Sequence, residues 1–286
     1  MNSKDRFTLL LQNTQTGATK GDRGETIDLW PAQVERLSAH NADIIVLNEV
    51  EGWEKNGHRQ LARACDDLDM DALPLPPGQS GNGVAMLYRR ARLGRWRGLD
   101  HKYAPEFHHG YLAAAFDMGV SHPVTVVACH IDPRTPDEGK TEAGKICWRS
   151  SKLGRTGRPG EIYSLIAGDI NAPPLVGPNA DWPRMEPYDR AIRYCDPLAD
   201  EPSRPNTDIA QAFADHGYHD AASLFLTQHP ERRDVLAPTG KTDRIDALHL
   251  SDSLKSTLRD YQRLSTPHGA SNHHGIRIDL DFSGLT

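Results

Sequence analysis

Two polar residues, Asp169 and Asn171, close a mostly apolar run at residues 162–167, and two prolines soon follow them. A continuous apolar run of this length indicates a buried strand. In extended backbone, residues two apart point to the same side, so the two side chains are expected together. A carboxylate beside a carboxamide offers a base or metal ligand next to a neutral donor and acceptor. The same pattern is also typical of an Asx turn that only ends the strand.

The other candidate residues also lie at or beside the ends of apolar runs. These residues are Asn13, Glu49, His130, Asp246 and His273. Polar groups gathered at one edge of stacked sheets indicate a site built on a rigid scaffold. Each residue alone has a simpler explanation: Glu49 would mark a strand leaving the core for solvent, and His130 would be a satisfied core histidine.

Together these residue types suit phosphoester chemistry. The isolated carboxylate of Glu49 suits Mg²⁺ or Mn²⁺, which prefer oxygen ligands. Two histidines and two further carboxylates can form a His–Asp pair and a separate proton acceptor. The sequence holds no Cys- or His-rich zinc set, no GxGxxG motif and no Walker loop. Phosphoester hydrolysis needs a cation, an activated water and donors around the transition state, and this inventory can supply them.

Apolar runs and helical periodicity predict the scaffold that positions these residues. Strands are expected at residues 7–13, 43–50, 83–89, 111–116, 123–130, 162–171, 243–251 and 276–282. Helices are expected at residues 26–41, 57–69, 135–153 and 207–216. Residues 172–206 are rich in Pro, Asp and Arg, which indicates a long surface excursion of the kind that often caps a site. No repeat or linker is evident, so residues 1–286 are expected to form a single domain.

The composition narrows the class of protein. The chain has 286 residues with 37% hydrophobic content, and its net charge of −6 leaves no global basic field of the kind that duplex-binding proteins often carry. No apolar run approaches the roughly 20 residues of a membrane helix, and the start shows no secretory signal. The four cysteines lack the paired spacing of a zinc site or disulfide framework. We expect a soluble, reduced, cytoplasmic protein without membrane contact, and we predict no protein partner.

The order of these motifs along the chain resembles the endonuclease/exonuclease/phosphatase superfamily, which has the fold of pancreatic deoxyribonuclease. The residues that carry the resemblance are 11–13, 43–50, 83–89, 128–132, 168–171, 244–246 and 271–274. They span nearly the whole chain, and their common order is specific for the superfamily although each motif alone is weak. The resemblance implies an α/β fold, a four-layer α/β/β/α sandwich of two mixed β-sheets flanked by helices.

The resemblance further implies a divalent cation, Mg²⁺ with Mn²⁺ as the alternative, held mainly by Glu49. Asn13 would lie beside it and hold metal-bound water or phosphate. The family usually has Ser-Asp-His before the last strand, and this chain has Asn272 in place of the Asp. Asn272 keeps an oxygen ligand but removes a negative charge, so a working site with altered metal affinity is expected. A shifted register that uses His274 in place of His273 is the alternative.

The resemblance also implies roles for the catalytic residues. Asp169 would position or deprotonate the attacking water, and Asn171 would orient that water or the phosphate. His130 would bind a phosphate oxygen. His273 would act as a base or stabilise charge, with Asp246 fixing its tautomer and raising its basicity.

The sequence therefore predicts a metal-dependent hydrolase that cleaves a P–O bond with activated water. The preferred hypothesis is a phosphodiesterase or nuclease-like hydrolase. A phosphatase acting on a nucleotide, a sugar phosphate or a lipid headgroup is the alternative, since the acidic net charge argues against tight duplex binding. A third hypothesis is a non-catalytic binding module that kept the fold and lost the metal through Asn272.

Overall fold

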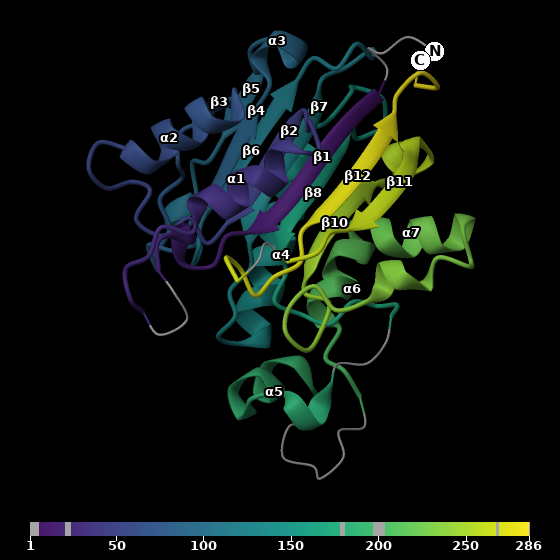
Figure 1. Cartoon of the computed structure of the whole chain (residues 1–286). Coiled ribbons are helices and arrows are strands. Elements are labelled where there is room, and N and C mark those ends of the chain that lie inside the picture. Colours follow the sequence, from purple (N-terminus) through teal and green to yellow (C-terminus); the bar gives the residue numbers. More distant parts are fainter. Residues whose placement is uncertain (1–5, 21–23, 178–180, 197–203, 267–268, 286) are drawn as a thin grey trace.

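The described residues of the computed structural model form two six-stranded mixed β-sheets that pack face to face (Figure 1). These residues are 6–20, 24–177, 181–196, 204–266 and 269–285. The first sheet has the strand order β11 (Leu258–Arg263), β12 (Ile276–Asp281), β1 (Arg6–Asn13), β2 (Ile44–Asn48), β4 (Val84–Tyr88) and β3 (Asp71–Ala72). The second has the order β5 (Gly98–Asp100), β6 (Tyr111–Phe116), β7 (Val124–His130), β8 (Ser164–Asp169), β10 (Asp246–Ser251) and β9 (Tyr218–Asp220).

Each sheet has a parallel pair of strands near its centre. β1 pairs with β2 and β7 pairs with β8 in parallel, whereas the other neighbours among the described strands are antiparallel. The inner faces share one apolar core, to which Leu11 and Val46 contribute from the first sheet and Val126 and Leu165 from the second. β7 and β8 are buried along their whole length, as expected for strands covered on both faces.

Helices cover the outer faces of both sheets. The helices on the outer faces are α1 (Trp30–Ser38), α2 (Arg59–Leu68), α4 (Pro136–Leu153) and α6 (Asp208–Asp215), and the structure also has α3 (Arg90–Leu93), α5 (Pro187–Arg193) and α7 (Ala221–Gln228). Trp30 of α1 packs edge-on against Trp53 with ring centroids 5.3 Å apart, in a cluster that includes Leu47 of β2. Ile146 of α4 and Phe213 of α6 belong to the apolar cluster on the outer face of the second sheet. The predicted four-layer α/β/β/α sandwich is therefore confirmed.

Several elements differ from the expectation. The helix expected at 26–41 begins at Trp30, and Ile27 before it is 43% exposed. The strand expected at 243–251 begins at Asp246. Strand β11 and helix α7 were not expected, because half of β11 is only partly buried and polar, and α7 has a weak apolar periodicity. Tertiary packing rather than local pattern forms both elements.

The expected excursion at residues 172–206 contains some helical structure. A short 3₁₀ helix, Trp182–Arg184, precedes α5, which lies at the lower end of the molecule in Figure 1. Residues 178–180 and 197–203 of the excursion lie outside the described residues. No helix in the described part of the chain is both long and apolar enough to cross a membrane.

Gly168 is a site where the packing of β7 against β8 tolerates no side chain. A Cβ atom there would lie 2.0 Å from the Cys129 carbonyl oxygen. Gly168→Ala is therefore expected to lower the free energy of unfolding by about 1–3 kcal/mol, as overpacking in a core does. The control is Gly144→Ala in α4, where a Cβ meets nothing within 4 Å and helix propensity predicts a gain of about 0.5–1 kcal/mol. Urea unfolding measures both values, and equal stabilities for the two variants would contradict the prediction.

Candidate active site

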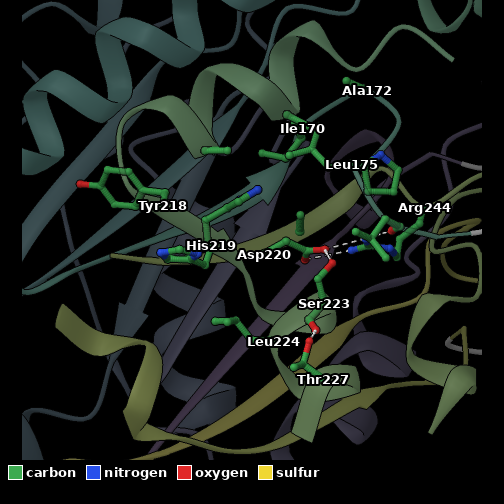
Figure 2. A pocket seen from close by; sticks show the side chains of 16 residues that line it. Ile170, Ala172, Leu175, Tyr218, His219, Asp220, Ser223, Leu224, Thr227 and Arg244 are labelled. Atoms are coloured by element: carbon green, nitrogen blue, oxygen red, sulfur yellow. Dashed lines mark hydrogen bonds and ion pairs between the residues drawn. The ribbon is translucent and has the colours of Figure 1, made fainter. Parts of the chain in front are cut away.

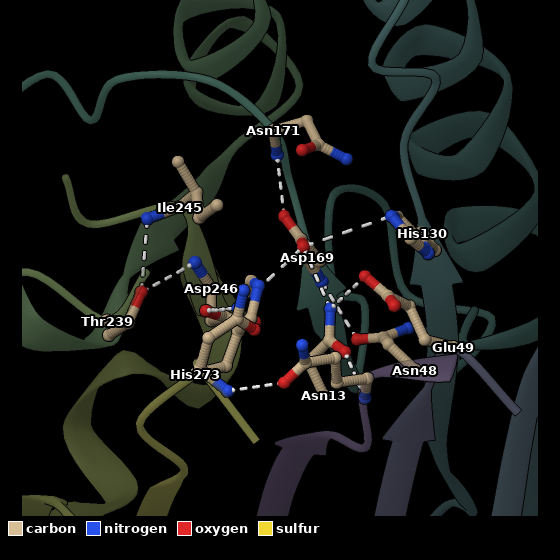
Figure 3. Close-up of polar contacts among 12 residues, drawn as sticks. Asn13, Asn48, Glu49, His130, Asp169, Asn171, Thr239, Ile245, Asp246 and His273 are labelled. Carbon is tan, nitrogen blue, oxygen red and sulfur yellow. Dashed lines mark hydrogen bonds and ion pairs between the residues drawn. The ribbon is translucent and has the colours of Figure 1, made fainter. Parts of the chain in front are cut away.

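Three candidate residues lie side by side across the second sheet. His130 on β7 and Asp246 on β10 are both register partners of Asp169 on β8. Because partners in neighbouring strands point to the same face, the three side chains converge. All three are buried, and Figure 3 shows Asp169 between His130 and Asp246.

Two carboxamides from the first sheet connect it to this row. Asn13 Nδ2 donates to Glu49 Oε1 at 2.9 Å and to Asp169 Oδ2 at 3.1 Å. Asn48, the last residue of β2, donates from Nδ2 to the Cys129 carbonyl at 2.7 Å, and its Oδ1 accepts from the Asp169 N–H at 2.9 Å. These buried hydrogen bonds bridge the two sheets at the end where the candidate residues meet.

The backbone around Glu49 is held in the left-handed region, which disfavours residues with a Cβ. Glu49 has a φ of 57°, and Gln15 and Thr16 in the facing loop each have a φ of 51°. The Gly17 N–H donates to the Glu49 carbonyl at 2.6 Å, and the Thr16 N–H donates to Glu49 Oε2 at 3.2 Å. Strained residues of this kind persist where their surroundings over-determine them, and they cluster at active sites.

His273 and Asp246 form a hydrogen-bonded ion pair. His273 Nδ1 donates to Asp246 Oδ2 at 2.8 Å. Thr239 Oγ1 accepts from the Asp246 N–H at 2.9 Å, and Ser271 Oγ accepts from the His273 N–H at 3.0 Å, so both residues are oriented through their backbones. Burial alone would lower the pKa of His273, but the neighbouring carboxylates, Asp246 foremost, raise it to about 10. The imidazole is therefore protonated at neutral pH.

Asp169 lies where negative charge exceeds positive charge. Its Oδ2 is 3.8 Å from His130 Nε2 and 4.0 Å from His273 Nδ1. Burial, followed by repulsion from Asp246, raises the pKa of Asp169. Burial lowers the pKa of His130 to about 3, so this imidazole is neutral and adds no positive charge. Together with Glu49, three carboxylates face one imidazolium, an excess that a divalent cation would neutralise.

One group of donor atoms among the described residues has the spacing of a metal site. Candidate ligand atoms of Glu49, Asp169 and His273 lie within 4.8 Å of one another, and the two carboxylates can bind a cation while His273 stays protonated. Carboxylate oxygens are the donors that Mg²⁺ and Mn²⁺ prefer. Asn13, predicted as a ligand, lies beside this group, but its Nδ2 donates to both carboxylates and its Oδ1 accepts from the Gln15 N–H at 2.9 Å.

Asn171 lies close to Asp169 but in a turn. Its φ is 53°, and its N–H donates to Asp169 Oδ1 at 3.0 Å, which closes an Asx turn. Its carboxamide Nδ2 donates to the Ile131 carbonyl at 2.9 Å. The expectation of extended backbone through Asn171 is therefore wrong, because the Asp169 carboxylate binds the N–H two residues further on.

Asn272 and His274 flank His273 and lie differently from it. Asn272 is exposed, and its backbone N–H donates to Gln15 Oε1 at 2.8 Å. His274 Nδ1 lies 2.8 Å from the Leu264 carbonyl oxygen, with which it forms a hydrogen bond. The structure thus brings His273 rather than His274 to the site, and a ligand role for Asn272 stays a prediction.

Sequence reasoning missed His109, which lies in the loop before β6. Its ring stacks on His130 with centroids 3.8 Å apart and an interplanar angle of 14°. Ser80 Oγ lies 2.7 Å from His109 Nδ1, and burial lowers the pKa of His109 to about 2. The stack holds the His130 ring in its plane without adding charge. No periodic pattern in the sequence marks His109. Asn48 was also missed, although a polar residue in an otherwise apolar strand is a signal that could have identified it.

Comparison with known proteins shows the family. A model of the endonuclease/exonuclease/phosphatase family matches residues 32–280. The chain belongs to that family. The family relationship agrees with the resemblance in motif order, and the curated proteins contain no match to this chain.

Solved structures of the endonuclease/exonuclease/phosphatase fold are similar over nearly the whole chain. An AP endonuclease from Leishmania major has a TM-score of 0.65 and 12% identity, covering 98% of this chain and 89% of that one. A family member from Beutenbergia cavernae has a TM-score of 0.60 and 16% identity, covering 97% of this chain and 72% of that one. A mannosyl-6-phosphatase from Bacteroides thetaiotaomicron has a TM-score of 0.60 and 14% identity, covering 95% and 98%. At these identities the likeness shows the fold.

Replacing Asn48 tests the bridge between the sheets. Asn48→Ala would leave the Asp169 N–H and the Cys129 carbonyl without their buried partner, so we expect the free energy of unfolding to fall by about 2–4 kcal/mol. The matched control is Asn206→Ala, which removes one exposed hydrogen bond, that from the Asp208 N–H, and is expected to cost less than about 1 kcal/mol. Chemical denaturation measures both, and a loss at Asn48 no larger than at Asn206 would contradict the bridging role.

Proposed function

We propose that the chain is a divalent-metal-dependent phosphoesterase, a phosphodiesterase or nuclease-like hydrolase that cleaves a P–O bond with activated water. The observation that carries the proposal is the convergence of Glu49, Asp169 and His273, whose candidate ligand atoms lie within 4.8 Å of one another where the two sheets meet. Membership of a family named for endonucleases, exonucleases and phosphatases supports the reaction class.

The donor set fits a hard divalent cation, Mg²⁺ first and Mn²⁺ second. Glu49 and Asp169 would hold it, with the Asn13 carboxamide beside them and Asn272 as a further oxygen donor from the exposed side. When bound, the cation would withdraw charge from the phosphoryl oxygens and relieve the repulsion between the carboxylates.

The remaining roles follow from the contacts of each side chain. Asp169 would position the attacking water or accept its proton. His273, held by Asp246 through Nδ1, would stabilise negative charge on the phosphoryl group through its other ring nitrogen. Neutral His130 would donate a hydrogen bond to a phosphate oxygen, and Asn171 would orient the water or the phosphate.

A phosphatase acting on a small phosphorylated molecule is the second candidate, and one surface feature favours it over a nuclease for long duplexes. A groove that begins at His108, next to the His109–His130 stack, is lined by five carboxylates and two cations. The carboxylates are Glu106, Asp132, Asp137, Glu138 and Glu142, and the cations are Arg134 and Lys145. Asp132 is paired with Arg134 at 2.6 Å and burial raises the pKa of Glu142 to about 7, so the acidic excess that would repel a polyanion in this groove comes mainly from Glu106, Asp137 and Glu138.

Hydrolysis of bis(p-nitrophenyl) phosphate tests the proposal. The purified protein is expected to release nitrophenol with Mg²⁺ or Mn²⁺ and to stop when EDTA is added. Glu49→Gln and His273→Ala are each expected to lower kcat at least about 100-fold, the range for removing a group that stabilises transition-state charge. The matched controls are Glu51→Gln and His274→Ala, which change neighbours of the same type outside the site and are expected to retain activity.

Failure of the proposal has a distinct signature. Wild-type activity that is unchanged by EDTA would contradict it, and so would equal activities of Glu49→Gln and Glu51→Gln. A folded protein without activity on any phosphoester would favour the binding-module hypothesis.

Supercoiled plasmid, single-stranded oligonucleotides and a panel of phosphomonoesters separate the two enzymatic candidates. Cleavage of the oligonucleotides supports the phosphodiesterase, and activity confined to monoesters supports the small-molecule phosphatase.

A further inference from the structure

A cavity of about 210 Å³ lies on the outer side of the second sheet. None of the candidate active-site residues lines it; its walls come from the segment after β8, from α6, β9 and α7, and from residues within or just before β10. Figure 2 shows Ile170 and Leu175 on one side of the cavity and Ser223 and Leu224 of α7 on the other. Leu175 is 46% exposed, so the rim presents an apolar side chain to solvent.

The cavity exists because β9 is short. β9 pairs with β10 over three residues, and the chain then leaves the sheet at Asp220, which caps α7 by accepting from the Ala222 N–H at 3.2 Å. Among the described strands, none therefore pairs with Ala247 along the edge of β10 that β9 occupies further on. Small side chains on the facing helix, Ala210 and Ala214 on α6, leave the space beside Ala247 unfilled.

Arg244 and Asp220, two charged residues that line the cavity, form an ion pair, and Arg244 Nε has no hydrogen-bond partner within the described residues. Arg244 Nη1 and Nη2 donate to the Asp220 carboxylate at 3.0 and 2.6 Å, and Ser223 Oγ donates to it at 2.7 Å. Burial would raise the pKa of Asp220, but Arg244 outweighs this effect and lowers it to about 2. The pair therefore stays ionised and carries no net charge. A charged ligand would lose its hydration in the cavity, and the ion pair carries no net charge that would attract it. The cavity therefore favours an uncharged ligand.

His249 gives the cavity a polar group that lacks a partner. Its ring stacks on Phe213 with centroids 4.4 Å apart and an interplanar angle of 16°. The residue is 6% exposed, and its Nδ1 is buried without a hydrogen-bond partner among the described residues. Burial lowers the pKa of His249 to about 4, so the imidazole is neutral at pH 7. Nδ1 is fully covered by protein, so a ligand in the cavity would meet the other ring nitrogen, Nε2, which also makes no hydrogen bond within the described residues, and would give it a partner.

We propose that this cavity binds a small uncharged molecule with an apolar ring and one hydrogen-bonding group that pairs with His249. An apolar cavity of about 150 Å³ accommodates benzene, so the larger volume here suits a two-ring molecule of the size of indole. The apolar walls provide the affinity, and the imidazole provides the selectivity for a polar edge. This site is independent of the proposed phosphoesterase activity.

The ligand would contact the back of the strand pair that carries the candidate active site. Ile170 and Ala247 line the cavity, and they directly follow Asp169 and Asp246 in the chain. Asp169 and Asp246 are register partners in the β8–β10 pair. A molecule in the cavity would therefore pack against two strand ends whose other faces position carboxylates of the site.

Ligand-observed NMR titrations with indole and with indene, which has the same shape but no N–H, test the proposal. The intact protein without added metal or phosphoester is expected to bind both saturably. His249→Phe keeps a ring that can stack on Phe213 but removes the acceptor, so indole affinity is expected to fall about threefold to tenfold, the value of one hydrogen bond, while indene affinity stays within about twofold. Ala214→Leu occupies part of the cavity and is expected to weaken binding of both probes.

The matched control is Ala62→Leu on the exposed side of α2, which is expected to bind both probes as the wild type does. Circular dichroism establishes that each variant is folded. Absence of saturable binding of either probe to the wild type would overturn the proposal, and so would wild-type affinity in Ala214→Leu. Equal losses of indole and indene affinity in His249→Phe would overturn the pairing with His249.

Discussion

The concentration of negative charge where the two sheets meet is the constraint on which the site depends. Glu49, Asp169 and Asp246 come from three strand ends, and His273 is the one protonated group that the described structure pairs with them. Carboxylates this close in a buried setting repel each other and favour protonation or a bound cation. This excess charge raises the pKa of His273, and it adds to the larger effect of burial in raising the pKa of Asp169.

Carboxamides hold Glu49 and Asp169 in place, whereas the His273 imidazolium pairs with Asp246. Asn13 donates to Glu49 and Asp169 together, and Asn48 accepts from the backbone of Asp169. Amide groups satisfy carboxylate oxygens without cancelling their charge, so the site stays negative after its hydrogen bonds are made. The strained backbone at Glu49 belongs to the same arrangement, because the packed sheets and the facing loop supply the stabilisation that holds it.

The strand ends could be predicted from the sequence because buried strands leave a strong apolar signal, and a polar residue that interrupts it stands out. This explains why Asp169, His130 and Asp246 were found and why they meet across one sheet. The turn at Asn171 was one of two conformations that the sequence indicated, and local sequence does not decide whether the Asn171 N–H donates to the Asp169 carboxylate or the strand continues. His109 and the cavity beside β9 depend on loop paths and on where a strand stops, which local sequence does not encode.

Titration of the metal-free protein with Mn²⁺ by isothermal titration calorimetry tests the central claim most directly, because it measures binding of a divalent cation to the negatively charged site without a substrate. The account predicts one saturable site per chain, weakened at least about tenfold in Asp169→Asn because a carboxylate is lost. Absence of saturable binding, or the same affinity in the wild type and in Asp169→Asn, would contradict it.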